Sequence, residues 1–366
     1  MHCTVNATSL TDGLNIVTRA LAARAAREIL NGVLLDAREG EITLSCTDGS
    51  LSIQTTIPAE IQAEGRLVLP GRLLTEMVRK LMGDITLKSN ESGRVSIQCL
   101  SYRANIAAMN EAEFPDITET VDGTVITLPQ NQLKRMISGV MFAIATDENR
   151  QLLTGTLLEV SPVEARLVAL DGFRLALQVA QGEFGTEGMR VVIPGRVMNE
   201  MSRILSDEEE PCAMTFDNGH MTAVFGQTKL STVLLMGDYI DYQRILPASF
   251  TTEAKVSRED TMTAIDRMSL IAREGKNNLI RLKFAGQSLT ITSNAEISDA
   301  QQEISADIVG ADLEIAFNAK YLNDIIRNVT DDEMIIKLNS NVSPCVIVPA
   351  ESRDYLFLVL PVRTFQ

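Results

Sequence analysis

Two hydrophobic patterns alternate along the chain, one typical of strands and one typical of helices. Apolar residues occupy every second position in segments such as Ile42–Cys46 and Leu51–Ile57, which is the period of a half-buried β-strand. From Leu133 to Ile144 the apolar residues recur three or four positions apart, which predicts a helix with one buried face. Alternation returns at Val95–Cys99 and Met221–Phe225. The mixture predicts an α+β protein with antiparallel strands.

A segment of 15 residues recurs at a fixed spacing. Leu67–Leu81 and Val191–Leu205 are identical at 8 of 15 positions, and Ile315–Val329 keeps the same residue character. The three segments begin 124 residues apart, a period of domain size that is too long for a solenoid. We therefore expect three repeated domains, each with two helices packed on antiparallel sheets. Their predicted bounds are 1–123, 124–250 and 251–366.

Each repeated segment is predicted to be a strand followed by the second helix of its domain. Pro70 and Pro194 stand at the junction, and proline suits a helix start because it lacks the N–H that would stay unpaired there. In the third segment Asn318 is expected to cap the helix instead.

Composition excludes several classes of function. Five cysteines are widely spaced and only two histidines occur, which leaves little material for a metal site or a histidine-based catalytic centre. No Walker A loop or dinucleotide-binding glycine pattern is present. No apolar run approaches membrane-spanning length, and the N-terminus lacks a basic stretch followed by an apolar one. We expect a cytoplasmic protein without cofactor or metal.

The net charge of −15 argues against nucleic-acid binding until the positions of the cations are considered. In the second helix of each repeat two cations lie seven residues apart, nearly two turns, so both point the same way. These pairs are Arg72 and Arg79, Arg196 and Arg203, and Lys320 and Arg327. An acid lies between the cations of each pair: Glu76, Glu200 or Asp324.

The six predicted helices are more basic than the rest of the chain. Windows 8–28, 70–82, 129–146, 194–206, 257–276 and 318–329 together hold 16 Lys and Arg against 9 Asp and Glu. The helices thus carry +7 and the remainder −22. A solvated face with ion pairs along it explains any one helix equally well. Recurrence in all three repeats favours a shared basic surface for phosphates, and nothing in the sequence is typical of base reading.

The repeats, the two Pro-Gly-Arg segments, and the stretches 171–175, 241–247 and 358–363 together resemble the bacterial DNA polymerase sliding clamps, the beta subunits of DNA polymerase III. The resemblance covers the whole chain. It implies a non-catalytic homodimer, two chains joined head to tail in a ring around double-stranded DNA. It also implies a basic loop residue, Arg24. The expected DNA-facing residues are Arg24, Arg72, Arg79, Arg196, Arg203, Lys320 and Arg327.

The resemblance further implies a pocket on repeats two and three for a short peptide of the DNA polymerase III alpha subunit, the clamp loader and other proteins with a clamp-binding motif. Arg174 and Arg244 are expected at its rim. Carried over residue by residue, the pocket comprises Leu153, Leu170, Phe173, Arg174, Leu175, Ile240, Arg244, Ile245, Tyr321, Pro344, Leu358, Leu360, Pro361 and Val362.

Some residues depart from the common family pattern. Asn318-Ala319-Lys320 replaces Pro-Gly-Arg in repeat three, Gln151 and Leu152 replace frequent aromatics, and the tail Thr364–Gln366 extends past the last shared residue.

Two other classes of function fit the sequence less well. A hydrolase or transferase would need the Asp48-Gly49 and Asp171-Gly172 pairs as active-site turns, although Asp-Gly is common in ordinary tight turns. A repeat-built adhesion or scaffold protein is disfavoured because Gly/Ser linkers are absent.

Overall fold

The three repeats share one order of elements: a strand, a helix, a run of strands, a second helix and three final strands. The structure, a computed structural model, describes residues 1–22, 26–90, 92–120, 122–186, 188–217, 219–275 and 278–363. The chain forms two compact units. One contains Met1–Lys134 and Glu200–Leu234, and the other contains Arg135–Asn199 and Leu235–Gln366.

Repeat one holds β1 (His2–Asn6), α1 (Ala7–Val17), β2 (Gly32–Arg38), β3 (Glu41–Thr47), β4 (Leu51–Pro58), β5 (Glu60–Ala63), β6 (Gly65–Pro70), α2 (Gly71–Val78), β7 (Asp84–Ser89), β8 (Arg94–Cys99) and β9 (Tyr102–Ala107). Repeat two holds β10 (Thr124–Pro129), α3 (Gln130–Met141), β11 (Gly155–Val160), β12 (Glu164–Leu170), β13 (Arg174–Gln181), β14 (Met189–Pro194), α4 (Gly195–Ile204), β15 (Pro211–Phe216), β16 (His220–Phe225) and β17 (Thr228–Val233). Repeat three holds β18 (Thr252–Ser257), α5 (Arg258–Glu274), β19 (Leu279–Ala285), β20 (Ser288–Asn294), β21 (Asp299–Gly310), β22 (Leu313–Asn318), α6 (Ala319–Arg327), β23 (Glu333–Leu338), β24 (Cys345–Pro349) and β25 (Tyr355–Val359). Repeat one alone carries the extra short strand β5 among the described elements.

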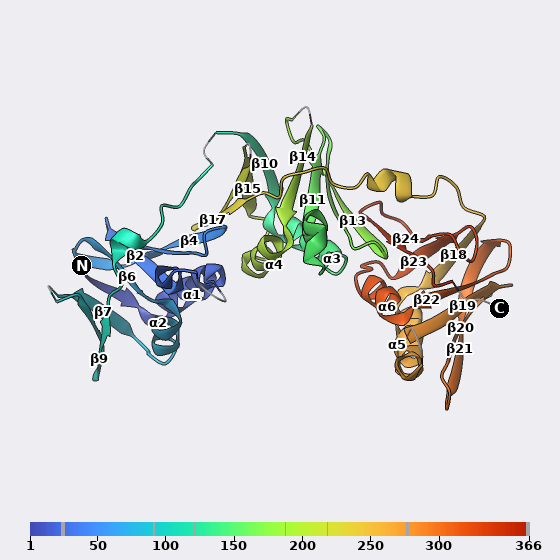
Figure 1. The fold of residues 1–366 in the computed structure, drawn as a ribbon, viewed down its shortest axis with the longest axis horizontal. Coiled ribbons are helices and arrows are strands. Elements are labelled where there is room, and N and C mark those ends of the chain that lie inside the picture. The colour runs from blue at the N-terminus through green and yellow to red at the C-terminus, as the bar shows by residue number, and fades with distance from the viewer. Residues whose placement is uncertain are drawn as a thin grey trace. The chain divides into compact units, whose positions relative to one another are not determined.

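All three sheets are antiparallel, and two of them join strands of neighbouring repeats. The first unit contains the sheet β5-β1-β7-β8-β9 and the sheet β10-β15-β16-β17-β4-β3-β2-β6. The second contains β14-β11-β12-β13-β25-β24-β23-β18-β21-β20-β19-β22 (Figure 1). β17 of repeat two therefore pairs with β4 of repeat one, and β25 of repeat three pairs with β13 of repeat two.

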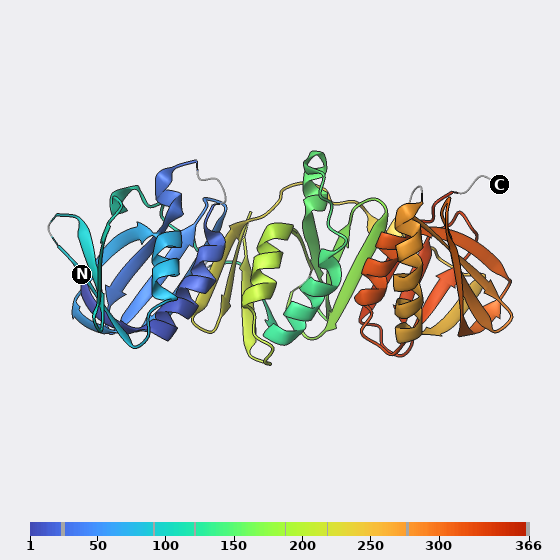
Figure 2. The same ribbon diagram turned by 90° about the horizontal axis from the view of Figure 1, so that it is seen from below.

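The two helices of a repeat cover one face of its sheets. α1 lies beside α2 in the first unit, and α5 lies beside α6 in the second (Figure 2). The apolar residues Leu322 and Ile325 of α6 are buried, as is Val329 just beyond the helix. Asn318 caps α6, since its side chain accepts a hydrogen bond from the N–H of Lys320 at 2.9 Å, which confirms the expected cap.

The predicted helices end before their sequence windows do, and α3 ends at Met141, short of the predicted Ile144. α1 ends at Val17 rather than near residue 28, because the chain turns into a short 3-10 helix at Thr18–Ala20. α2 ends at Val78, so Leu81 lies outside it and is only half-buried. The domain bounds near residues 123 and 250 stay a prediction, because the two compact units divide repeat two between them.

Replacing Gly195 with alanine is expected to lower the free energy of unfolding by about 1–3 kcal/mol. An added Cβ would lie 2.5 Å from the carbonyl oxygen of Thr154, a backbone atom that cannot turn aside. Urea unfolding measures the loss. Gly182→Ala is the control, because its nearest neighbour is a ring atom of Phe184 at 3.2 Å. Equal losses in both variants would contradict the close approach as the cause.

Candidate functional sites

The turn between β12 and β13 starts the predicted peptide pocket. One carboxylate oxygen of Asp171 accepts hydrogen bonds from the N–H groups of Phe173 at 2.8 Å and Arg174 at 3.0 Å. Gly172 adopts a φ of +93°, which favours glycine. Asp48 closes the β3–β4 turn of repeat one in the same way. Both Asp-Gly pairs are thus structural turns, and the one in repeat two presents Phe173 to solvent with 54% of its surface exposed.

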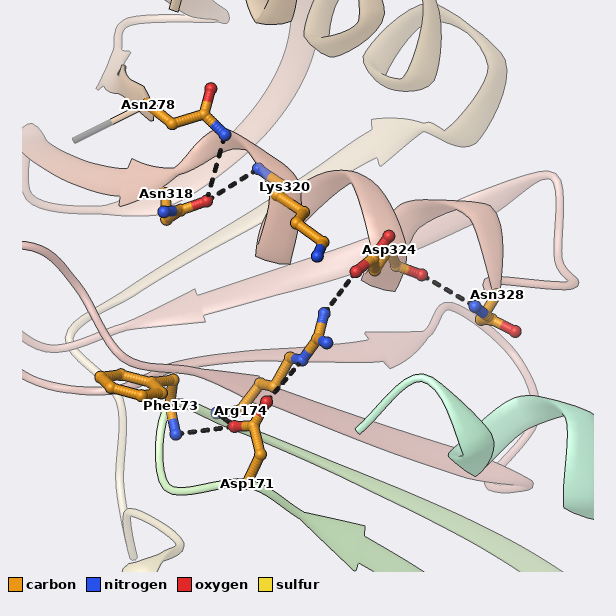
Figure 3. A network of polar contacts seen from close by, with 8 residues as sticks. All are labelled: Asp171, Phe173, Arg174, Asn278, Asn318, Lys320, Asp324 and Asn328. Carbon is orange, nitrogen blue, oxygen red and sulfur yellow. Dashed lines mark hydrogen bonds and ion pairs between the residues drawn. The ribbon is translucent and has the colours of Figure 1, made fainter. Parts of the chain in front are cut away.

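Arg174 is buried, so its predicted place at an exposed rim is wrong. Only 9% of its surface is exposed. Its Nε contacts Asp171 Oδ2 at 3.0 Å, and its Nη1 contacts Asp324 Oδ2 on α6 at 2.5 Å (Figure 3). Because two carboxylates offset its charge, the guanidinium can be buried, and it holds β13 against α6.

Two aromatic rings contact that guanidinium. Its carbon lies 4.7 Å from the ring centroid of Tyr321 and 5.3 Å from that of Phe142. Tyr321 in turn stacks on Phe173 at 5.6 Å between centroids. Phe142, Arg174, Tyr321 and Phe173 thus form a series of contacts, which we call the aromatic column. It links the half-buried Phe142 to the exposed ring of Phe173, so the position of that ring depends on the buried arginine.

Four predicted pocket residues are buried parts of the core. They pack in one cluster with Tyr242 and are Leu153, Leu170, Leu175 and Leu358. Leu360 is partly buried against this cluster. These residues belong to the core rather than to an exposed binding surface. A Leu358→Ala variant would therefore test the core as much as the pocket.

The remaining predicted pocket residues lie at the surface. Ile240, Ile245 and Arg244 are exposed, and Arg244 pairs with Asp241 at 2.9 Å. The half-buried members are Tyr321, Pro344, Leu360, Pro361 and Val362. Leu360 donates its N–H to the carbonyl of Phe173 at 2.8 Å, which brings the segment after β25 to the aromatic column. The predicted last strand ends at Val359, and Leu360–Val362 lie beyond it.

Tyr242 anchors the segment that carries Arg244 and Ile245. Its hydroxyl donates to Glu159 on β11 at 2.6 Å, and burial, together with that carboxylate, raises the pKa of the phenol. The short helix Tyr242–Ile245 is thereby fixed to the sheet. Sequence reasoning missed Tyr242, Phe142 and Asp324 as supports of the pocket, because each acts through a residue distant in the chain.

The six predicted DNA-facing cations that the structure describes are all exposed: Arg72, Arg79, Arg196, Arg203, Lys320 and Arg327. Arg24 lies outside the described residues, as does the tail Thr364–Gln366. Arg79 is the C-cap of α2 and donates to the side chain of Asn15 on α1. Arg327 pairs with Asp266 on α5 at 3.1 Å.

The acids between the cations contact arginines on other elements. Glu200 contacts Arg19 at 3.1 Å, and Asp324 contacts Arg174. The alternative interpretation is a solvated helix face whose charges pair only with one another. It does not fully describe repeats two and three, because these two acids pair with arginines of other elements.

Three observations on the described residues concern metal ligands, thiols and membrane-spanning helices. No group of three or more His, Cys, Asp or Glu side chains there is placed to hold a metal ion. The five cysteines are free and buried, and burial raises the pKa of Cys3 to about 11 and that of Cys212 to about 12. No helix in this part of the chain has the length and apolar character needed to cross a membrane.

Comparison with known proteins assigns the family. Three models of the DNA polymerase III beta subunit match in order: the N-terminal domain at residues 1–118, the central domain at 127–241 and the C-terminal domain at 243–363. The chain is 31% identical to the beta sliding clamp of Staphylococcus epidermidis over 376 aligned positions that cover 100% of both chains. The chain belongs to the DNA polymerase III beta subunit family, the beta sliding clamps. Members of this family are non-catalytic processivity factors of DNA replication, so the hydrolase and adhesion alternatives are wrong.

Further beta sliding clamps agree over nearly the whole chain. The clamp of Staphylococcus aureus is 31% identical over 363 positions, 96% of each protein. Among solved structures, the DNA polymerase sliding clamp of Bacillus subtilis matches with a TM-score of 0.96 and 29% identity, and the beta subunit of Thermotoga maritima with 0.92 and 28%. Both comparisons cover 100% of each chain. The clamp fold of three α+β domains is thus confirmed.

Proposed function

We propose that two copies of this chain join head to tail into a ring that encircles double-stranded DNA in the cytoplasm. The proposal rests on the way in which neighbouring repeats are joined. In each joint, the third of the long strands between the two helices of one repeat pairs with the last strand of the next repeat. Two such joints, β4–β17 and β13–β25, occur within the chain. Among the described residues, the strands for a third are β9, which pairs only with β8, and residues 299–305 of β21, which pair only with β20, whereas residues 306–310 pair with β18. Both stretches keep an unpaired edge in the part of the chain that the structure describes. A second copy would pair both edges and remove a site of aggregation.

The register of this third joint follows from the other two. Ser52, Leu175 and Asp299 occupy equivalent positions. Each is the first residue of its strand that pairs with the preceding strand, directly after the hairpin turn. Ser52 pairs with Ser231. Ser231 corresponds to Asn105 on β9 when the β16–β17 and β8–β9 hairpins are aligned on their closing pairs. The joint is therefore expected to pair Asn105 of one copy with Asp299 of the other.

Charge and exposure support this register. It places Arg103 opposite Gln301, with Asp299 and Glu303 diagonally on either side. All four side chains are exposed in the single chain. A shift by one residue would turn exposed residues of one strand toward the buried face of the other.

Solution mass and topology test the ring. Light scattering at low micromolar concentration should give about twice the chain mass of 40.1 kDa. Clamp loaded on a nicked circular duplex should leave the DNA when the circle is cut. A stable monomer, or retention on the linear product, would contradict the ring.

The exposed cations of α2, α4 and α6 are proposed to meet the phosphates without reading sequence. Replacing Lys320 and Arg327 with glutamine should lower the weak direct affinity for duplex DNA several-fold. It should also reduce the slope of log affinity against log salt by about 2, near 0.9 for each lost phosphate contact. Titrations at several salt concentrations measure both quantities. Arg281 and Lys283, exposed cations on β19 of the same repeat, supply the matched double glutamine control. An equal effect from the control would point to net charge alone.

The surface around Phe173 is proposed to bind a short peptide of the polymerase III alpha subunit, the clamp loader and other proteins with a clamp-binding motif. Support comes from the exposed rings and aliphatic side chains of Phe173, Ile240 and Ile245 above a buried apolar base. Aromatic and aliphatic anchors of a peptide fit such a surface. Bound partners would then move along DNA with the ring.

A further inference from the structure

Helix α6 carries residues of both proposed sites. Lys320 and Arg327 are exposed on the face proposed for DNA, whereas Tyr321 belongs to the aromatic column. Asp324 lies one turn from all three, because residues three and four apart are neighbours on a helix. It therefore stands where the two faces meet.

Among the described residues, Asp324 forms its ion pair with Arg174 and not with the nearby cations of α5 and α6. A cavity of about 260 Å³ between α5 and α6 is lined by Arg273, Lys320 and Arg327 as well as Asp324. Arg327 contacts Asp266 instead, at 3.1 Å. Asp324 contacts Arg174 at 2.5 Å and is 32% exposed (Figure 3). Its backbone carbonyl accepts a hydrogen bond from Asn328 at 2.8 Å, which helps to fix this turn of the helix.

Arg174 is not matched by an arginine in repeat one. At the offset of the two Asp-Gly turns, the residue of repeat one that corresponds to Arg174 is Leu51, a buried aliphatic residue. The acids that correspond to Asp324 are Glu200, which contacts a different arginine of repeat one, Arg19, and Glu76, which is exposed. Among the described residues, the contact between such an acid and an arginine that also packs on aromatic rings therefore occurs at the joint that carries the proposed pocket.

We propose that Asp324 is a positioning residue for partner binding. Its carboxylate fixes the guanidinium of Arg174, which fixes Tyr321 and, through it, the exposed ring of Phe173. Without that carboxylate the guanidinium keeps only Asp171, and the aromatic column loses its fixed geometry. A helix assigned to DNA thereby sets the shape of the peptide site. This inference rests on the proposed peptide pocket.

The test is binding of a fluorescent peptide that carries the clamp-binding motif of the alpha subunit from the same organism. Asp324→Asn should weaken binding about tenfold, since it removes one partner of a buried charged contact. Asp324→Glu should restore most of the affinity. In the Arg174→Lys background, which should still bind the peptide weakly, Asp324→Asn should cause much less than its tenfold loss, because the two residues act through one contact.

Glu76→Gln is the matched control. It removes the corresponding acid of α2, an acid that forms no ion pair with an arginine in the part of the chain that the structure describes. It also changes the charge of the face proposed for DNA by the same amount as Asp324→Asn. Its peptide affinity should equal that of the unmodified protein. Urea unfolding of each variant ensures that folded proteins are compared.

The outcomes separate the inference from the function on which it rests. If Arg174→Ala loses the peptide while Asp324→Asn binds it normally, Asp324 is no positioning residue and the pocket stands. If neither change affects affinity, both the pocket and the inference are overturned. Additive losses from the two changes would also overturn the inference, because they would show independent roles.

Discussion

Replacing Arg174 with alanine is expected to abolish binding of the partner peptide and to lower the free energy of unfolding by about 3–5 kcal/mol. The change leaves Asp171 and Asp324 without the cation that they share, and it removes the charged member of the aromatic column. Fluorescence anisotropy measures the peptide affinity and urea unfolding measures the stability. The solution mass should stay near twice that of the chain, because the proposed third joint lies elsewhere.

Two further variants serve as controls for this prediction. Arg174→Lys keeps the charge but cannot reach both carboxylates with one planar group, so it should fold and still bind poorly. Arg244→Ala removes a solvent-exposed ion pair and should change stability by less than about 1 kcal/mol. Peptide affinity that survives in both Arg174 variants would refute the pocket.

Reversing the charge of Arg103 is expected to dissociate the ring. In the proposed joint, Arg103→Glu faces Asp299 and Glu303 of the other copy, and like charges across paired strands oppose pairing. Light scattering should then report a mass near that of one chain at low micromolar concentration. Retention on nicked circular DNA should be lost at the same time.

A second charge reversal makes this test specific. Glu303→Arg should restore the dimer when it is combined with Arg103→Glu, because the attraction returns with its sign exchanged. Lys88→Glu is the control, an exposed reversal on β7, which already has neighbours on both sides within its sheet. A dimer that tolerates Arg103→Glu, or one that Lys88→Glu disrupts equally, would contradict the predicted register.

Much of the fold could be predicted from the sequence because the same pattern of strand and helix occurs in three repeats. The spacing of 124 residues identified the strand and helix at β6–α2, β14–α4 and β22–α6. The end of α1 could not be predicted, because the apolar pattern continues beyond Val17 while the backbone turns at Thr18. The pairing of β17 with β4 also left no trace in the sequence, since strand alternation does not name a partner.

The residues of the proposed site could be predicted from the sequence, but the burial of each residue could not. The family resemblance supplied Phe173, Arg174 and Tyr321, which the structure brings into contact. It could not tell that Arg174 is buried, because its second carboxylate, Asp324, lies 150 residues further along the chain. Charge patterns along a helix indicate exposure, and only the folded chain shows which charge turns inward.

The joint between β4 and β17 has a consequence for synthesis of the protein. Thr55 and Thr228 face each other across this joint, separated by 173 residues. At a translation rate of about 5–20 residues per second, β4 waits roughly 10–30 s for its partner strand to leave the ribosome. During that time the strand is an open edge next to other nascent chains. The first compact unit can close only after its last segment, Glu200–Leu234, has emerged, so its completion depends on more than half of the chain.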